Sequence, residues 1–343
     1  KVVFVSRCRS FCSIYFSIGK RKLTSIKIIH NMNNMETEEF NRFFKKQSLA
    51  STYKPMFLKC LLDLGDYEEE EGGQWVKKQN GNLIVDLNFV IVRFLRYYHP
   101  LKFTFKLKQF PHAEKQLDVY KNLEKFKDEI GVKSQPTKKQ LCQDKFTQIR
   151  EETIASDGIK YQVLPKLLND CNIYEPSRDK KSIKIKNEIV EHMRKNKSVL
   201  ESAINYMLAK YLEGINASPN IATKLQEKIP RKKLNTGFPE IIELQNGKCF
   251  FCDREFDNYA QEHFLPWNFI FRTENFNITA ACKTCNSKKN DRLPHEKYLE
   301  KIISRNKRLN DLPSGYSEEF FRQLYETCRI EYHGKDVELW SLK

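Results

Sequence analysis

Apolar side chains recur at helical spacing over much of the first two thirds of the chain. In residues 36–63 one stripe contains Phe40, Phe43 and Phe44, and another follows the segment Ser-Thr-Tyr-Lys-Pro that begins at residue 51. Hydroxyl side chains followed by an early proline are typical of a helix start, because they can cap the free amides of the first turn. The pattern predicts one or two helices here, with hydroxyl capping of the second.

The next apolar segments continue this helical pattern. Residues 83–98 fit a helix capped by Asp86 better than a short strand. Residues 113–130 and 137–154 are rich in Lys and Glu and are expected to be helical, whereas residues 186–212 contain a long amphipathic helix. Most of this region is therefore predicted to form a helical core.

A basic connector at residues 228–237 marks the expected domain boundary. It separates a mainly helical domain, residues 36–230, from a second domain, residues 238–343. The chain begins with Lys, and its first Met is Met32. Because residues 1–35 also lack clear signal-peptide features, we expect them to be a non-native or disordered extension.

Composition narrows the classes of function. The 343 residues are 40% hydrophobic and 30% charged, which allows a buried core. The sequence contains no apolar run long enough to span a membrane, so we expect no membrane partner. The net charge of +16 favours a polyanion such as nucleic acid, although a soluble protein from a lysine-rich proteome would look similar.

The cysteines fall into two groups. Four of them form two tight pairs, Cys249 with Cys252 and Cys282 with Cys285, and two such pairs can complete a tetrahedral zinc site. A site closed by four thiolates has no position for water, so the zinc is expected to be structural. The other six stand singly, which is typical of reduced thiols in a cytoplasmic protein: Cys8, Cys12, Cys60, Cys142, Cys171 and Cys328.

The stretch between the cysteine pairs predicts two short strands, residues 261–264 and 278–282, followed by a helix that begins within residues 286–292. This ββα unit resembles the HNH endonuclease family, in particular HNH proteins of bacterial restriction and anti-phage defence systems. The resemblance rests on these features: Glu262-His263 followed by FLPW, Asn277, Asn286 directly after Cys285, Lys289, and Leu293-Pro294. The expected fold class is thus α+β, a mainly helical domain followed by a zinc-stapled ββα-metal nuclease domain with C-terminal helices.

The resemblance implies a role for each matched residue. His263 would be the general base that takes a proton from water, and Asn277 would fix its orientation by bonding nearby backbone. Glu262 and Asn286 would hold one Mg²⁺ or Mn²⁺ ion through oxygen atoms, although the family usually has Asp where this chain has Glu262. The implied reaction is metal-dependent hydrolysis of phosphodiester bonds in DNA.

The partners follow from the same resemblance. Lys288, Lys289 and Arg292 are expected to contact phosphate, with a solvated helix face as the other interpretation. The helical domain would supply recognition or bind a partner, for which a separate ATPase or methyltransferase subunit is the expected class. The sequence does not specify the recognition site or the oligomeric state.

Two other functions stay open at this point. Glu262 in place of Asp is the one feature that favours a non-catalytic, zinc-stabilised module for binding nucleic acid. An RNA-cleaving nuclease with the same fold would use the same chemistry. Metal-dependent cleavage distinguishes the first alternative, and offering RNA beside DNA distinguishes the second.

Overall fold

The computed structural model describes residues 35–45, 49–111, 115–226, 238–255 and 258–342. Residues 1–34 of the expected extension lie outside the described residues. The whole connector at 228–237 lies outside them as well. The chain divides into two compact units. The helical unit comprises Asn34–Arg231 with Asn268–Phe271, and the cysteine unit includes Lys232–Trp267 and Arg272–Lys343.

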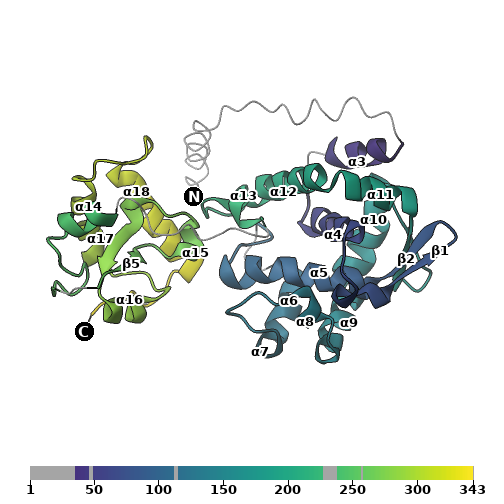
Figure 1. Cartoon of the computed structure of the whole chain (residues 1–343), viewed down its shortest axis with the longest axis horizontal. Helices are drawn as coiled ribbons and strands as arrows, with labels where there is room; N and C mark the ends of the chain where they lie inside the picture. Colours follow the sequence, from purple (N-terminus) through teal and green to yellow (C-terminus); the bar gives the residue numbers. More distant parts are fainter. Residues whose placement is uncertain (1–34, 46–48, 112–114, 227–237, 256–257, 343) are drawn as a thin grey trace, which may run out of the picture. The chain divides into compact units, whose positions relative to one another are not determined.

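The helical unit is built around α4 and α5, whose apolar side chains are almost completely buried. Helix α4 packs against both α5 and α12 (Figure 1). Its α-helices are α3 (Met35–Lys45), α4 (Tyr53–Leu62), α5 (Leu87–His99), α6 (Asp118–Lys125), α7 (Lys127–Ile130), α8 (Lys138–Leu141), α9 (Thr147–Ala155), α10 (Leu164–Asp170), α11 (Asn187–Lys195), α12 (Lys197–Glu213) and α13 (Ile221–Lys224).

Short 3₁₀ and π-helical turns connect several of these helices. The 3₁₀ turns are η3 (Asp63–Gly65), η4 (Glu69–Glu71), η5 (Gly73–Trp75) and η7 (Asp144–Phe146), and the π-helical segments are η6 (Pro100–Thr104) and η8 (Gly158–Val163). The turn η3 continues directly from α4, so this helical segment ends at Gly65.

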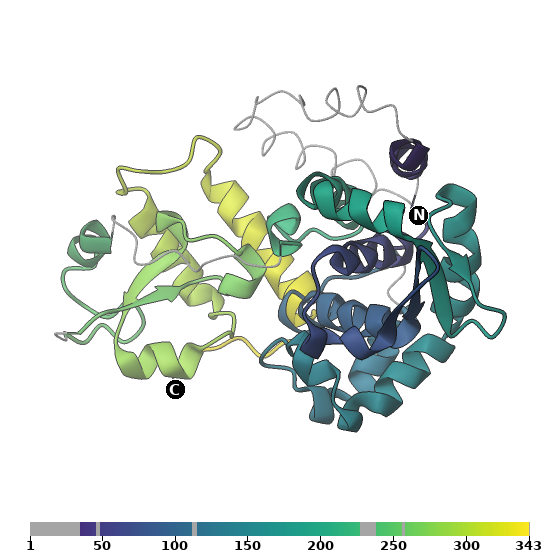
Figure 2. The ribbon, with the colours of Figure 1, turned by 45° about the vertical axis from the view of Figure 1, so that its right-hand side comes forward.

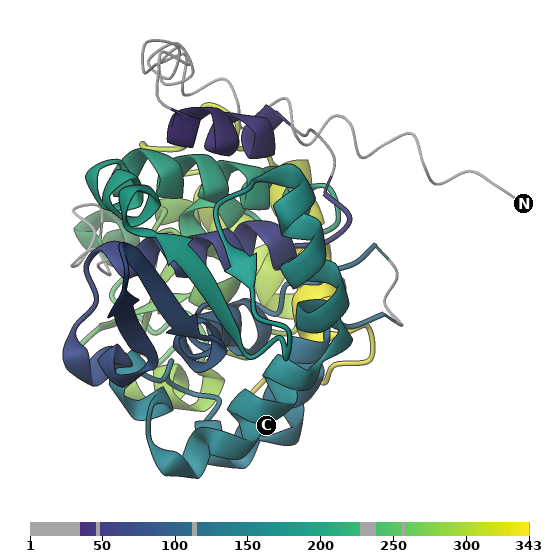
Figure 3. The same cartoon turned by 90° about the vertical axis from the view of Figure 1, so that its right-hand side faces the viewer.

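The helical unit also contains a small antiparallel sheet that the apolar pattern did not predict. Figure 3 shows its strands side by side, in the order β1 (Val76–Gln79), β2 (Asn82–Asp86), β4 (Ser182–Lys186) and β3 (Glu175–Pro176). One face buries alternate residues of the two central strands, Leu83, Val85, Ile183 and Ile185. Both central strands have only five residues, and β4 carries Lys184 and Lys186 on the other face, so their apolar pattern is too short to stand out.

The boundaries correct several sequence expectations. Residues 82–98 form both of the elements we weighed, since Asp86 ends β2 and its side chain then caps α5 by accepting a bond from the Asn88 amide at 2.8 Å. The amphipathic segment 186–212 is two helices separated at Asn196. The expected hydroxyl cap of α4 is wrong for Thr52, because its hydroxyl donates instead to Gln109 Oε1 at 2.6 Å.

The cysteine unit is a two-stranded hairpin among helices (Figure 2). Its elements are α14 (Phe238–Leu244), β5 (Ala260–His263), α15 (Trp267–Ile270), η9 (Asn275–Asn277), β6 (Ile278–Ala281), α16 (Lys283–Lys289), α17 (Glu296–Asn306), α18 (Glu318–Thr327) and the π-helical η10 (Cys328–His333). Only Trp267 of α15 belongs to this unit. The overall class is α+β, as expected.

Two helices of this unit cover the hairpin. Ile278 and Ala280 of β6 join Ile241 of α14 in one apolar cluster, to which Leu309 adds. Helix α16 packs against β5. It begins at Lys283, three residues before our expected start, because the Cys282 sulfur caps it by accepting a bond from the Cys285 amide at 3.4 Å.

In the part of the chain that the structure describes, no helix combines the length and apolar character needed to cross a membrane.

Candidate metal and nuclease site

Four cysteine sulfurs converge at one end of the hairpin. The Sγ atoms of Cys249, Cys252, Cys282 and Cys285 all lie within 4.8 Å of one another. Four sulfurs bound to one zinc ion at about 2.3 Å lie roughly 3.8 Å apart, so a small contraction around the ion would complete the site. These residues can therefore hold a metal such as zinc, as the sequence predicted.

Backbone amides support the same cluster. The Cys282 amide donates to Cys249 Sγ at 3.3 Å, and the Cys285 amide donates to Cys282 Sγ at 3.4 Å. Such bonds stabilise sulfur as thiolate, the form that binds a metal. Burial raises the pKa of the Cys252 and Cys285 thiols, whereas hydrogen bonds from the backbone and from the other cysteines outweigh burial at Cys282 and lower its pKa.

The cluster joins the hairpin to α16. The first cysteine pair lies between α14 and β5, and the second spans the end of β6 and the start of α16. Within the hairpin, Glu262 pairs with Thr279 and His263 pairs with Ile278. A metal bound to the four sulfurs would therefore fix the helix against the two strands.

Glu262 projects toward α16 and forms a buried ion pair there. Its Oε1 atom lies 2.6 Å from the Nζ atom of Lys289, whose side chain is completely buried. Lys289 Nζ also donates to the Asn290 carbonyl at 3.2 Å. Lys289 thus lies in the interior, not on the surface where we expected it to contact phosphate.

Burial dominates the ionisation of this pair. It raises the pKa of the Glu262 carboxyl above its usual range, although the nearby Lys289 charge works in the opposite direction. Burial also lowers the pKa of the Lys289 ammonium, against the influence of Glu262. Both groups lose more from desolvation than they regain from each other.

His263 is the last residue of β5 and is half-buried. Successive residues of a strand point to opposite faces, so the imidazole projects away from the face on which Glu262 meets α16. A substrate bond that both residues act on would have to lie at this end of the hairpin.

Asn277 makes the backbone contacts that the resemblance implied. Its Oδ1 atom accepts from the Leu265 amide at 2.8 Å, and its Nδ2 atom donates to the Leu265 carbonyl at 3.0 Å. The Phe264 amide donates to the Asn277 carbonyl at 2.8 Å. Asn277 is fully buried, so these bonds fix the chain directly after His263.

Asn286 and the two exposed cations lie on α16 or just beyond it. Asn286 is half-buried and three residues before Lys289, so it shares the helix face that Lys289 directs toward Glu262. Lys288 and Arg292 are exposed, and the Arg292 guanidinium donates to the Lys288 carbonyl. Both can reach a solvent-borne phosphate.

Sequence reasoning missed the neighbours of the ion pair. Asp291 lies close enough for its charge to raise the pKa of both Glu262 and Lys289. Its Oδ2 atom accepts a bond from the Tyr332 hydroxyl at 2.8 Å, and Tyr332 belongs to the π-helical η10. No signal in the sequence linked Asp291 or Tyr332 to this site.

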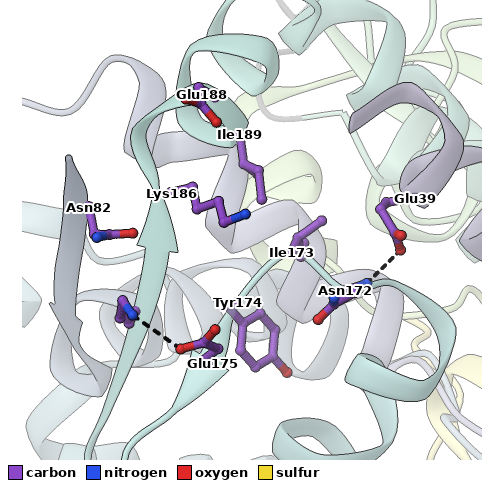
Figure 4. A pocket seen from close by; sticks show the side chains of 10 residues that line it. Glu39, Asn82, Asn172, Ile173, Tyr174, Glu175, Lys186, Glu188 and Ile189 are labelled. Carbon is purple, nitrogen blue, oxygen red and sulfur yellow. Dashed lines mark hydrogen bonds and ion pairs between the residues drawn. The ribbon is translucent and has the colours of Figure 1, made fainter. Parts of the chain in front are cut away.

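The helical unit holds a separate cavity of about 150 Å³ between β4, α11 and the segment that precedes β3 (Figure 4). Lys186 and Asn82 point toward it. Glu175 pairs with Lys184 at 3.3 Å, and Glu39 accepts a bond from the Asn172 amide at 2.7 Å. Much of the charge around this cavity is thus already compensated locally.

Comparison with known proteins adds no assignment. No family model matches the chain, no curated protein matches it, and no solved structure matches it. A function for this chain is therefore inferred from the residues of the site itself.

Proposed function

We propose that the cysteine unit is a metal-dependent endonuclease of the HNH type that hydrolyses phosphodiester bonds in DNA. One juxtaposition carries the proposal. A hairpin that ends in Glu262-His263 packs against a helix that carries Asn286, and a four-cysteine cluster links the two. This packing supports the proposal, because the motif resemblance implies that these residues act at one site.

His263 is the proposed general base. An imidazole titrates near neutral pH, so it can accept a proton from the attacking water under physiological conditions. Asn277 is the positioning residue, since it fixes the backbone of Leu265 just beyond the strand end. A small displacement of a catalytic base costs a large factor in rate, which gives this buried amide a function.

Glu262 and Asn286 are the proposed ligands of the catalytic cation. Carboxylate and amide oxygens suit a hard ion such as Mg²⁺ or Mn²⁺, and the two residues belong to β5 and α16, which pack against each other. When bound, such an ion supplies positive charge that polarises the scissile phosphate and stabilises the leaving oxygen. The donor set fits the ion, and Lys289 is its competitor for Glu262.

Lys288 on α16 and Arg292, three residues beyond the end of that helix, are the proposed phosphate contacts. Contacts of this kind release counterions, so binding should weaken as salt increases. The net charge of +16 supports a polyanionic substrate in the same way.

A cleavage assay tests the proposal. The full chain is dialysed to remove loosely bound cations and incubated with supercoiled plasmid, without and with added Mg²⁺ or Mn²⁺. Zinc content is measured in parallel, because a chelator strong enough to stop the reaction could also remove structural zinc. We expect nicking or linearisation only with added cation, and its loss in Glu262→Gln at unchanged zinc content.

The same assay examines the alternatives. Retained DNA binding with no cleavage under any cation condition would overturn the nuclease and favour the zinc-stabilised binding module. Cleavage of RNA but not DNA, offered side by side, would keep the chemistry and change the substrate.

A further inference from the structure

The buried partner of Glu262 is an ammonium group of this chain. Lys289 Nζ contacts Glu262 Oε1 at 2.6 Å, and no part of the Lys289 side chain is exposed. A divalent ion bound to this carboxylate would lie about 2.1–2.5 Å from its oxygen atoms. The ion and the ammonium would then be close neighbours of like charge, in a buried environment that screens poorly.

The charges around the pair come from three elements. Glu262 lies on β5, Lys289 ends α16, and Asp291 follows α16 by two residues. From η10, Tyr332 donates to Asp291 at 2.8 Å, and Cys328 lies close enough to influence Lys289. With the two carboxyl groups ionised, one cation and two anions face each other here.

We propose that Lys289 is a built-in counter-cation that occupies the Glu262 carboxylate in the metal-free protein, and that a divalent cation binds to this carboxylate by displacing the Lys289 ammonium. The Asn290 carbonyl and the nearby Asp291 carboxylate can accept the displaced group. The competition weakens cation binding and keeps the carboxylate paired when no cation is bound. The inference rests on the proposed function only in taking Glu262 as a cation ligand.

Mn²⁺ binding to the full chain tests this without any cleavage. Lys289→Met retains the buried aliphatic volume but removes the charge, so two carboxylates remain without the internal competitor. We expect Mn²⁺ affinity, measured by electron paramagnetic resonance at fixed pH and salt, to rise on the order of tenfold or more.

The matched control is Lys283→Met. Lys283 is an exposed residue of the same helix, so this variant removes the same formal charge without affecting the pair. It should bind Mn²⁺ like the unmodified chain. Equal or weaker Mn²⁺ binding by Lys289→Met, or an equal gain in Lys283→Met, would overturn the proposal.

A second measurement needs no substitution at the pair and covers the case in which Lys289→Met does not fold. In a chain with ¹⁵N-labelled lysine, the buried Lys289 ammonium should give a signal protected from solvent exchange. Mg²⁺ should remove or shift that signal, whereas K⁺ at equal ionic strength should not. If the Lys289 signal does not change when Mg²⁺ is added at the concentration at which Mn²⁺ saturates the chain, displacement of the ammonium is contradicted.

The two proposals can fail separately. Tighter Mn²⁺ binding by Lys289→Met, with no cleavage by any form of the chain, would contradict the proposed nuclease activity and support the proposed role of Lys289. Metal-dependent cleavage with identical Mn²⁺ affinity in the unmodified chain and in Lys289→Met would support the nuclease activity and contradict the role of Lys289.

Discussion

Asp63 of the helical unit and Glu262 of the cysteine unit are both buried carboxylates, but their charges are compensated very differently. In the helical unit Asp63 is approached by three cations: Arg93 Nε at 3.2 Å, Lys138 Nζ at 3.0 Å and Lys197 Nζ at 3.0 Å. The Tyr97 hydroxyl also donates to it at 3.1 Å. Burial opposes ionisation of Asp63, but these cations together hold its pKa below the usual range.

Glu262 has one cation where Asp63 has three. Lys289 alone does not offset the burial, so the pKa of Glu262 lies above its usual range. Asp63 is therefore a structural carboxylate whose charge is already compensated, whereas a further positive charge would still stabilise the ionised form of Glu262. Asp63 links α4 to distant helices, whereas Glu262 has an electrostatic deficit that a divalent ion would fill.

Loss of the four-sulfur cluster should have the largest effect, and it should affect one unit only, because the one such cluster among the described residues lies in the cysteine unit. Cys285→Ser should abolish zinc binding and unfold the cysteine unit, since structural zinc contributes about 10–16 kcal/mol in small zinc domains. The helical unit should persist. Zinc stoichiometry and limited proteolysis measure both effects.

Cys142→Ser is the control for this prediction. Cys142 is half-buried in the helical unit and outside the cluster, so its loss should leave zinc stoichiometry unchanged. A Cys285→Ser chain that resists protease across both units would remove the structural role of the metal.

Neutralising each carboxylate in turn should change the stability of its unit by a different amount. Asp63→Asn removes the buried carboxylate that all three cations share and leaves them only the more exposed Glu71 and Asp66 as counter-charges, so it should destabilise the helical unit by about 3–5 kcal/mol. Glu262→Gln keeps an acceptor for Lys289, whose pKa is already lowered by burial, and should cost the cysteine unit only about 1–3 kcal/mol. Hydrogen exchange of α5 and β5 peptides reports each unit separately. Equal losses would contradict the comparison.

The pH dependence of the helical unit follows from the lowered pKa of Asp63. A carboxyl with a depressed native pKa contributes stability that is present above its unfolded pKa, about 3.9. That contribution disappears as pH falls from about 4 through the lowered native value. Hydrogen exchange of α5 between pH 6 and pH 3 should show this loss, and Asp63→Asn should make the curve flatter. An unchanged curve would mean that Asp63 does not carry the acid sensitivity.

The smallest expected effects come from two tyrosines, one in each unit, whose hydroxyl groups donate to an acidic side chain. Tyr332→Phe removes the bond to Asp291, and Tyr97→Phe removes the bond to Asp63. Each should cost about 0.5–1.5 kcal/mol. Tyr97→Phe should lie at the lower end, because three cations still satisfy Asp63. Urea denaturation monitored by peptide-resolved exchange would detect a reversed order.

Local chemistry explains what could be predicted from the sequence. The cysteine spacing indicated the four-sulfur cluster, and the residues around His263 and Asn277 indicated the two strands. Asp86 was recognisable as a cap because a short polar acid precedes an apolar helix. These signals depend on neighbours in the chain, which a single sequence displays directly.

The missed features depend on partners far away in the chain. Lys289 looked like a surface cation, and only its contact with a residue 27 positions earlier explains its burial. Thr52 looked like a cap, but its hydroxyl bonds Gln109, 57 positions later. In β4, apolar residues alternate over only five positions, which is too short to distinguish a strand from a loop.

The role of His263 as general base is tested by the cleavage of supercoiled plasmid by His263→Ala, with Mn²⁺ saturating and zinc content verified. His295→Ala is the matched control, because His295 is an exposed residue that caps α17 by accepting the Lys297 amide. The account predicts that His263→Ala loses at least about 100-fold in rate while it stays folded, and that His295→Ala cleaves normally. A folded His263→Ala protein that cleaves as fast as the unmodified chain would contradict it.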